Sequence, residues 1–133
     1  MKIYFILSLV FFLSCATSKN NKKSTTEIDL ITFGSGGGFT GEITTYTLLL
    51  DGIVLEGKNQ INQIDPKQAL LLYHKAEKWK NYSYDQPQNM YFFLEIKTAE
   101  KTNHIVWGYG SKKANPEILN FYIELMGLVK IKT

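Results

Sequence analysis

The chain has 133 residues, of which 44% are hydrophobic, 14% aromatic and 20% charged. This composition excludes a disordered protein, because disordered chains lack the apolar and aromatic residues that offset chain entropy. The length predicts one domain with one core. The net charge is +3, and all 15 basic residues are lysines spread among 12 acidic residues. Nucleic-acid surfaces usually carry clustered arginines, so we expect no nucleic-acid partner.

The amino terminus has the pattern of a secretory signal peptide. Lys2 supplies a positive charge, and the segment from Ile3 to Leu13 is almost wholly apolar. A membrane-spanning helix needs about 20 apolar residues, and this run is shorter. We therefore predict that residues 1–14 are a signal peptide rather than a permanent span.

The single cysteine of the chain, Cys15, ends this segment. Its position resembles a lipobox, in which lipoprotein signal peptidase cuts before a cysteine that already carries diacylglycerol. Ser14 matches the small residue before the cysteine, whereas Phe12 stands where the family has leucine. The resemblance implies that Cys15 is lipidated. The alternative is ordinary secretion, because Ser14 and Ala16 also satisfy the small-x-small rule for cleavage after Ala16.

Residues 15–27 are predicted to be the lipidated cysteine and a polar tether. The segment is rich in Lys, Asn, Ser and Thr and has no apolar periodicity, which is typical of a flexible linker. By resemblance to lipoprotein sorting rules, the lack of an aspartate after Cys15 favours the outer membrane. The lack of an acidic stretch favours its periplasmic face. We therefore expect a cell-envelope protein bound to the membrane through its lipid anchor.

The rest of the chain, residues 28–133, is predicted to fold as one domain that begins with three strands. The segments 28–33, 43–50 and 53–56 are rich in β-branched and aromatic residues, which favour strands.

A tight turn is predicted at Asp51-Gly52, since this dipeptide suits a two-residue type I′ turn. The turn fixes the register of the two flanking strands. The expected pairs are Leu50 with Ile53 and Leu48 with Leu55.

Two helices are predicted from their capping signals. Asp65-Pro66 begins a helix that runs to about Lys80, and Asn115-Pro116 begins another that ends at Met126 or Val129. Helical spacing predicts the residues of the first helix that face the sheet. They are Ala69, Leu72, Tyr73, Ala76 and Trp79. For the second helix they are Ile118, Phe121, Tyr122, Leu125 and Met126.

A second hairpin is predicted between the helices, with strands at 91–97 and 104–109. The order β-β-β-α-β-β-α indicates an α+β fold, with an antiparallel sheet of about five strands and two helices packed on one face. From Ile31 onward, this order resembles uncharacterised small domains of Gram-negative lipoproteins. The resemblance implies a fold and a location, and it carries no assigned activity or site.

The glycine-rich segment Gly34–Gly41 contains a match to G-x-G-x-x-G from Gly36 onward. A dinucleotide site needs a helix after this motif, whereas residues 42–47 have a strand sequence. We therefore interpret the segment as a wide turn or bulge between strands. An anion nest or a partner-binding loop is the alternative. Its candidate contact residues are Gly36, Gly37, Gly38 and Phe39.

The aromatic residues offer a second candidate site. Trp79, Trp107 and Tyr109 fall on faces that we expect to be buried, whereas Tyr82 and Tyr84 fall in a loop. Because amphipathic rings suit a half-exposed groove, the two loop tyrosines are candidates for stacking against a sugar or another small ligand.

The two histidines, His74 and His104, lie in no metal-binding pattern, and the chain has no G-x-S-x-G motif. We therefore expect no metal, no cofactor and no catalytic residues. Two functions remain open. One is a binding or accessory module that contacts an envelope protein through the glycine-rich segment or a sheet edge. The other is a glycan-binding or small-ligand-binding protein. A flat apolar patch would favour the first, and a cleft walled by Tyr82 and Tyr84 the second.

Overall fold

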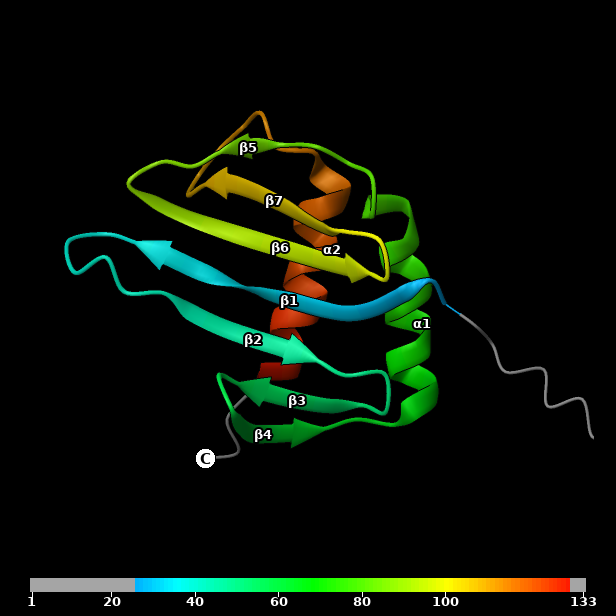
Figure 1. The fold of residues 1–133 in the computed structure, drawn as a ribbon. Coiled ribbons are helices and arrows are strands. Elements are labelled where there is room, and N and C mark those ends of the chain that lie inside the picture. The colour runs from blue at the N-terminus through cyan, green and yellow to red at the C-terminus, as the bar shows by residue number, and fades with distance from the viewer. Residues whose placement is uncertain (1–25, 130–133) are drawn as a thin grey trace, which may run out of the picture.

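The structure, a computed structural model, describes residues 26–129, so the predictions for the signal peptide and Cys15 lie outside the described residues. The predicted α+β class is confirmed (Figure 1). The sheet is mixed and has seven strands rather than five, in the order β4-β3-β2-β1-β6-β7-β5. The strands are β1 (Ile28–Gly37), β2 (Thr44–Leu48), β3 (Ile53–Glu56), β4 (Asn59–Gln63), β5 (Asp85–Gln86), β6 (Met90–Thr98) and β7 (Thr102–Gly108).

The two helices, α1 (Pro66–Ala76) and α2 (Pro116–Met126), lie on the same face of the sheet (Figure 1). A 3-10 turn extends each to 14 residues, through Glu77–Trp79 after α1 and Gly127–Val129 after α2. The predicted caps are present at both starts. Asp65 Oδ1 accepts a hydrogen bond from the amide of Lys67, and Asn115 Oδ1 accepts one from the amide of Glu117.

The hairpin between β2 and β3 differs from the predicted one by one residue. Leu48 pairs with Val54 rather than with Leu55. The amide of Gly52 donates to the Leu49 carbonyl at 3.0 Å, and Gly52 has φ +93°. Asp51 has no positive φ, so the loop is a three-residue turn with a glycine bulge instead of a two-residue type I′ turn. As a result Val54 faces the core and is buried.

The glycine-rich segment is not a link between strands at its start, because Gly34 to Gly37 belong to β1. At Gly37 a Cβ atom would lie 2.0 Å from the Asn89 carbonyl oxygen, and φ is +86°. At Gly34 it would lie 2.0 Å from the Thr44 carbonyl oxygen. Glycine therefore lets β1 run closely between β2 and β6, and the connecting loop is confined to residues 38–43.

The core lies between the helices and one face of the sheet. All five predicted sheet-facing residues of α1 and the turn after it are buried, as are four of those predicted for α2; Met126 is half-buried. Two buried tyrosines tie the helices to the sheet. Tyr73 Oη donates to the Leu48 carbonyl at 2.7 Å, and Tyr122 Oη donates to the Gly34 carbonyl at 2.9 Å.

The start of β1 is fixed by polar contacts. Glu77 Oε1 accepts hydrogen bonds from Thr26 Oγ1 at 2.7 Å and from the Glu27 amide at 3.0 Å. Lys80 forms ion pairs with both Glu27 and Glu77. This end of the sheet is where the predicted tether would join the folded part of the chain.

Candidate binding surface at the end of the sheet

Exposed apolar side chains gather at the end of the sheet where β1 finishes. Phe39 is fully exposed, and Ile43, Met90 and Tyr109 are 59%, 53% and 66% exposed. We call these four residues the apolar tip. The other exposed large apolar residues of the described chain, Leu50, Leu71 and Ile123, lie in the β2–β3 turn, on α1 and on α2.

Backbone contacts and close packing bring three of these residues and the adjoining loop together. The Tyr109 amide donates to the Met90 carbonyl at 2.9 Å, and Met90 pairs with Gly37 at the end of β1. A Cβ atom at Gly36 would lie 3.2 Å from Ile43 Cγ1. The end of β1, the start of β6 and the end of β7 therefore form one protruding end of the sheet (Figure 1).

The loop from residue 38 to residue 43 places Phe39 at the apex. Gly38 and Gly41 have φ +78° and +65°, and the Gly41 amide donates to the Gly38 carbonyl at 3.3 Å. The Gly38 amide donates to the Asn89 carbonyl at 2.7 Å, which fixes the base of the loop to the chain before β6. Glycines at these positions allow the sharp turn without strain.

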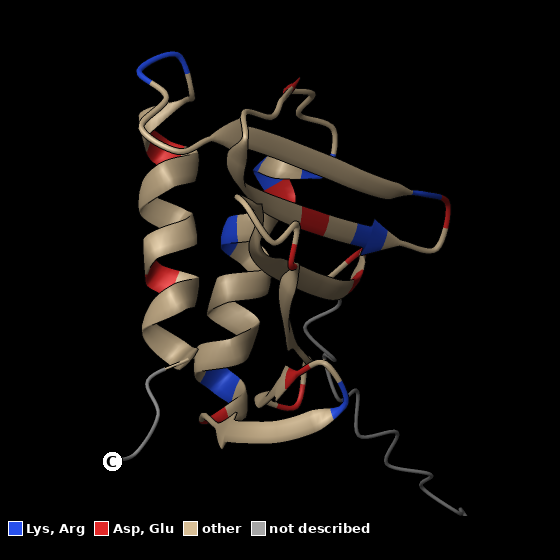
Figure 2. Cartoon of the chain, turned by 90° about the vertical axis from the view of Figure 1, so that its left-hand side faces the viewer, with Lys and Arg blue, Asp and Glu red and all other residues tan. Residues whose placement is uncertain are grey.

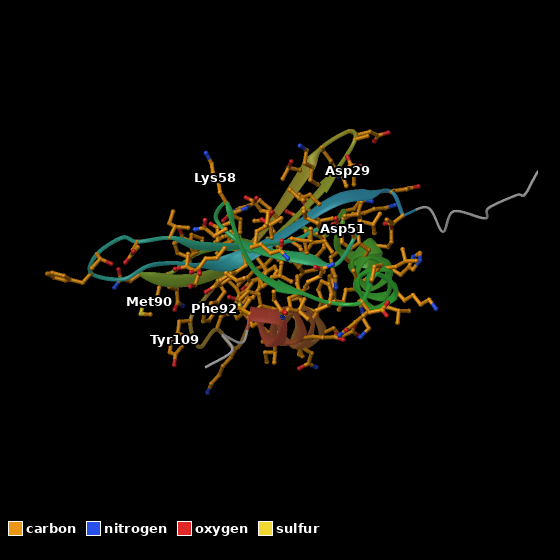
Figure 3. All side chains as sticks on the ribbon, turned by 90° about the horizontal axis from the view of Figure 1, so that it is seen from below. Asp29, Asp51, Lys58, Met90, Phe92 and Tyr109 are labelled. Carbon is orange, nitrogen blue, oxygen red and sulfur yellow. The ribbon has the colours of Figure 1, made fainter. Side chains whose placement is uncertain are left out.

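The tip is apolar on both faces of the sheet. Phe92 packs under α2 against the Tyr122 ring, and its centroid lies 5.9 Å from that of Tyr109. Met90 lies two residues before Phe92 and therefore shares its face. Figure 3 shows Met90, Phe92 and Tyr109 on the side of the sheet that carries α2. Ile43 instead lies beside Gly36, whose position along β1 faces the other side.

Tyr109 corrects a prediction. Its alternation with Trp107 predicted burial, and Trp107 is buried, but Tyr109 is exposed. The strand β7 ends at Gly108, and this end of the sheet projects beyond the two helices (Figure 1). Tyr109 therefore lies on the predicted face of the sheet, but neither helix covers that face at the end of β7.

The tyrosine pair predicted to be exposed, Tyr82 and Tyr84, is half-buried and packs against the core. The ring centroid of Tyr82 lies 5.3 Å from that of Trp79, in a T-shaped arrangement. Asn103 Nδ2 donates to the carbonyls of Trp79 and Tyr82, and the Val106 amide donates to the Tyr84 carbonyl at 2.8 Å. These bonds draw the segment after α1 onto the sheet edge.

The described surface has three hollows that neither Tyr82 nor Tyr84 lines. The groove between α1 and α2 has a volume of about 400 Å³ and is lined by Trp79 and Phe121. Ion pairs join its two sides, Lys75 with Glu124 at 2.6 Å and Lys78 with Glu117. The groove therefore has charged, mutually paired walls.

The shifted pKa values belong to structural contacts. Burial raises the pKa values of Tyr73 and Tyr122 above the usual range of tyrosine. Burial alone would also raise the pKa of Glu77, but hydrogen bonds from Thr26, Lys80 and the Glu27 amide lower it below its usual value. None of these three groups lies in the apolar tip.

Within residues 26–129, no group of three or more His, Cys, Asp or Glu side chains is arranged to hold a metal ion. The helices of this part of the chain are also too short or too polar to cross a membrane. Comparison of the chain with protein-family models, curated proteins and solved structures found no match. The fold and the tip thus define a small α+β protein with an exposed apolar end.

Part of this surface is predictable from the sequence. Gly36 to Phe39 were candidates, and the structure places them at the end of β1 and at the loop apex. Ile43, Met90 and Tyr109 were missed as site residues. Met90 directly precedes a predicted strand whose partner ends at Tyr109, so pairing these two strands would have brought both residues to one end.

Proposed function

We propose that this protein is a membrane-anchored cell-envelope lipoprotein with a non-enzymatic binding domain, and that the apolar tip is its binding surface. The observation that carries the proposal is the concentration of Phe39, Ile43, Met90 and Tyr109 at one protruding end. Exposed apolar clusters are rare on monomeric proteins unless they contact a partner or a membrane. Phe39 is fully exposed and has no packing role that would explain a large apolar side chain at the apex.

The sheet edges support the tip as the contact surface because both edges are poorly suited to pairing. The edge strand β4 has an irregularity opposite Val54 and Leu55, which leaves Ile61 without a register partner. The other edge, β5, has two residues. Bulged or very short edge strands are the devices by which proteins avoid edge-to-edge pairing. A partner that adds a strand is therefore disfavoured.

The geometry of β1 also supports the proposal. The predicted tether joins at the start of β1, and the tip lies at its end (Figure 1). β1 has 10 residues, and a strand rises about 3.3 Å per residue, so the tip is about 33 Å from the point where the tether joins. A domain held by its amino terminus would carry the binding surface at its opposite end.

Site-specific photo-crosslinking in cells tests the proposal. A benzophenone amino acid replaces Phe39 in the full chain, and the matched control carries it at Leu71, which is 63% exposed on α1. We expect adducts, whether with protein or with lipid, from position 39 and not from position 71. Equal labelling at the two positions, or none at position 39, would contradict the assignment of the tip. Intact mass of the mature protein tests the anchor, because a chain that begins at Thr17 without acyl groups would exclude lipidation of Cys15.

A further inference from the structure

The four residues of the apolar tip are exposed at its apex and on both faces of the sheet. Phe39 occupies the apex, Met90 and Tyr109 lie on the helix-covered face, and Ile43 lies toward the open face. A flat protein surface would cover one of these faces and leave the other in water. A bilayer interface would surround the inserted loop and cover the apex and both faces together.

We infer that the occupant of the apolar tip is the surface of a lipid bilayer. This inference rests on the proposed function, because it names what the proposed binding surface contacts. Phe39 and Ile43 enter the boundary between headgroups and acyl chains. Tyr109 lies at the level of the headgroups, where its ring is in apolar surroundings and its hydroxyl meets water.

Basic residues lie beside the tip. Lys112 and Lys113 follow Tyr109 in the loop to α2, and they line a hollow together with Gln88, two residues before Met90. Figure 2 views the molecule from the tip end and shows basic residues in the loop that leads into α2. Lysines next to an apolar loop attract anionic lipid headgroups. Glu42 is the acidic residue of the loop itself.

The depth of insertion is limited by the loop backbone. Amide and carbonyl groups without a protein partner are costly in hydrocarbon, and the loop from 38 to 43 is neither helical nor part of the sheet. Glu42 is exposed at its end. The tip therefore reaches the interface and stops short of the bilayer centre.

The predicted tether is long enough for this contact. A chain from Cys15 to Thr26 can span up to about 40 Å when extended, which exceeds the length of about 33 Å expected for β1. A lipid at Cys15 and a tip at the end of β1 can therefore reach the same membrane. Each contact raises the effective concentration of the other, so the tip would orient the anchored domain on the bilayer.

Vesicle binding of the chain that begins at residue 16 tests the inference. Among residues 26–129, the buried core side chains lie between Ile28 and Leu128, so this chain retains all of them, and it lacks Cys15. Thr40→Cys supplies a single labelling site next to an intact Phe39, and Gln68→Cys on α1 is the control. The probe is an NBD label, with vesicles of phosphatidylethanolamine and phosphatidylglycerol, or of phosphatidylcholine alone.

We expect the NBD emission at position 40 to shift to the blue and to gain intensity with anionic vesicles, and the emission at position 68 to stay unchanged. Phe39→Ser should lower the partition coefficient about tenfold, because it removes a large apolar side chain from the interface. Leu71→Ser removes an apolar residue that is 63% exposed on α1, and it should leave binding unchanged. Replacing Lys112 and Lys113 by Ala should weaken binding to the vesicles that contain phosphatidylglycerol. It should leave binding to phosphatidylcholine vesicles unchanged.

Two results would overturn the inference and distinguish it from the proposed function. If vesicles of both compositions leave the label at position 40 unchanged, while the crosslinker at position 39 captures a protein or a second copy of this chain, the lipid occupant is wrong and the binding surface stands. If vesicles give no change and the crosslinker captures nothing, both proposals are wrong.

Discussion

The two ends of β1 differ in chemistry. At its start, Thr26 and Glu27 are held to Glu77 by hydrogen bonds, and Lys80 adds ion pairs to two carboxylates. At its end, the strand runs through glycines into a loop whose apex carries the fully exposed Phe39.

The same strand is therefore fixed to the rest of the domain at its start and exposes apolar side chains to solvent at its end. Polar groups at the start satisfy each other, so they hold the chain where the predicted tether joins. The apolar side chains at the end of β1 are not shielded from water by other residues, so their burial against a partner or a membrane would be favourable in free energy. Substitutions of side chains at the two ends of β1 should therefore act differently, on stability at the start of the strand and on binding at its end.

The largest expected effect is at Gly37. Gly37→Ala would place a Cβ atom 2.0 Å from the Asn89 carbonyl oxygen at a φ of +86°. We expect a loss of about 3 kcal/mol or more in the free energy of unfolding, since backbone must move to relieve the clash. Urea denaturation measures it. Gly41→Ala is the matched control, because its φ is +65° and its Cβ atom would meet nothing within 4 Å; it should cost about 1 kcal/mol.

A smaller loss is expected from Tyr122→Phe on α2, whose hydroxyl donates to the Gly34 carbonyl of β1. This change leaves the buried Gly34 carbonyl without the hydroxyl that donates to it at 2.9 Å. An unpaired buried acceptor costs about 1–2 kcal/mol, which a shift of the urea midpoint would report. Tyr109→Phe removes a hydroxyl from an exposed ring of the tip and should change stability by less than about 0.5 kcal/mol. Equal losses from the two variants would contradict the assigned contact.

A still smaller loss, with a defined pH dependence, is expected from Glu77→Gln at the start of β1. The pKa of Glu77 is lowered in the folded protein from its usual value of 4.5. Its contribution is therefore complete above the pKa of the unfolded chain and is lost as pH falls through the lower folded value. We expect the variant to lose about 1 kcal/mol of unfolding free energy relative to the wild type at neutral pH. This difference between the two proteins should decline below about pH 4.

The control for Glu77 is Glu124→Gln. Glu124 pairs with Lys75 on the exposed outer side of the helices, and exposed ion pairs contribute little. Its unfolding free energy should differ from that of the wild type by less than about 0.5 kcal/mol. A variant of Glu77 that behaves like this control at every pH would show that the start of β1 is not fixed by that carboxylate.

The elements predicted correctly from the sequence are those whose signals are local. The caps at Asp65 and Asn115 and the helical spacing of apolar residues lie within each helix. β4 was missed because Asn59 to Gln63 are mostly amides and show no apolar alternation. β5 was missed because two residues become a strand through pairing with β7, which the local sequence does not encode.

The candidate site was predictable in part for a related reason. Phe39 among glycines is unusual in the sequence itself, so the loop could be identified. The exposure of Met90 and Tyr109 depends on where the helices end over the sheet, which no local pattern reports. Tyr82 and Tyr84 were mistaken for exposed residues because the bonds from Asn103 and the Val106 amide that hold their segment are long-range.

The smallest expected effect on stability is that of Phe39→Ser, which should change binding and leave folding intact. Because the side chain is fully exposed, its loss should change the unfolding free energy by less than about 0.5 kcal/mol while it lowers vesicle binding and removes a principal apolar contact of the tip. Urea denaturation and vesicle co-sedimentation of the same preparation measure both quantities. A variant that unfolds earlier would give Phe39 a packing role. If the variant keeps both its stability and its vesicle binding, Phe39 is not a binding contact of the apolar tip.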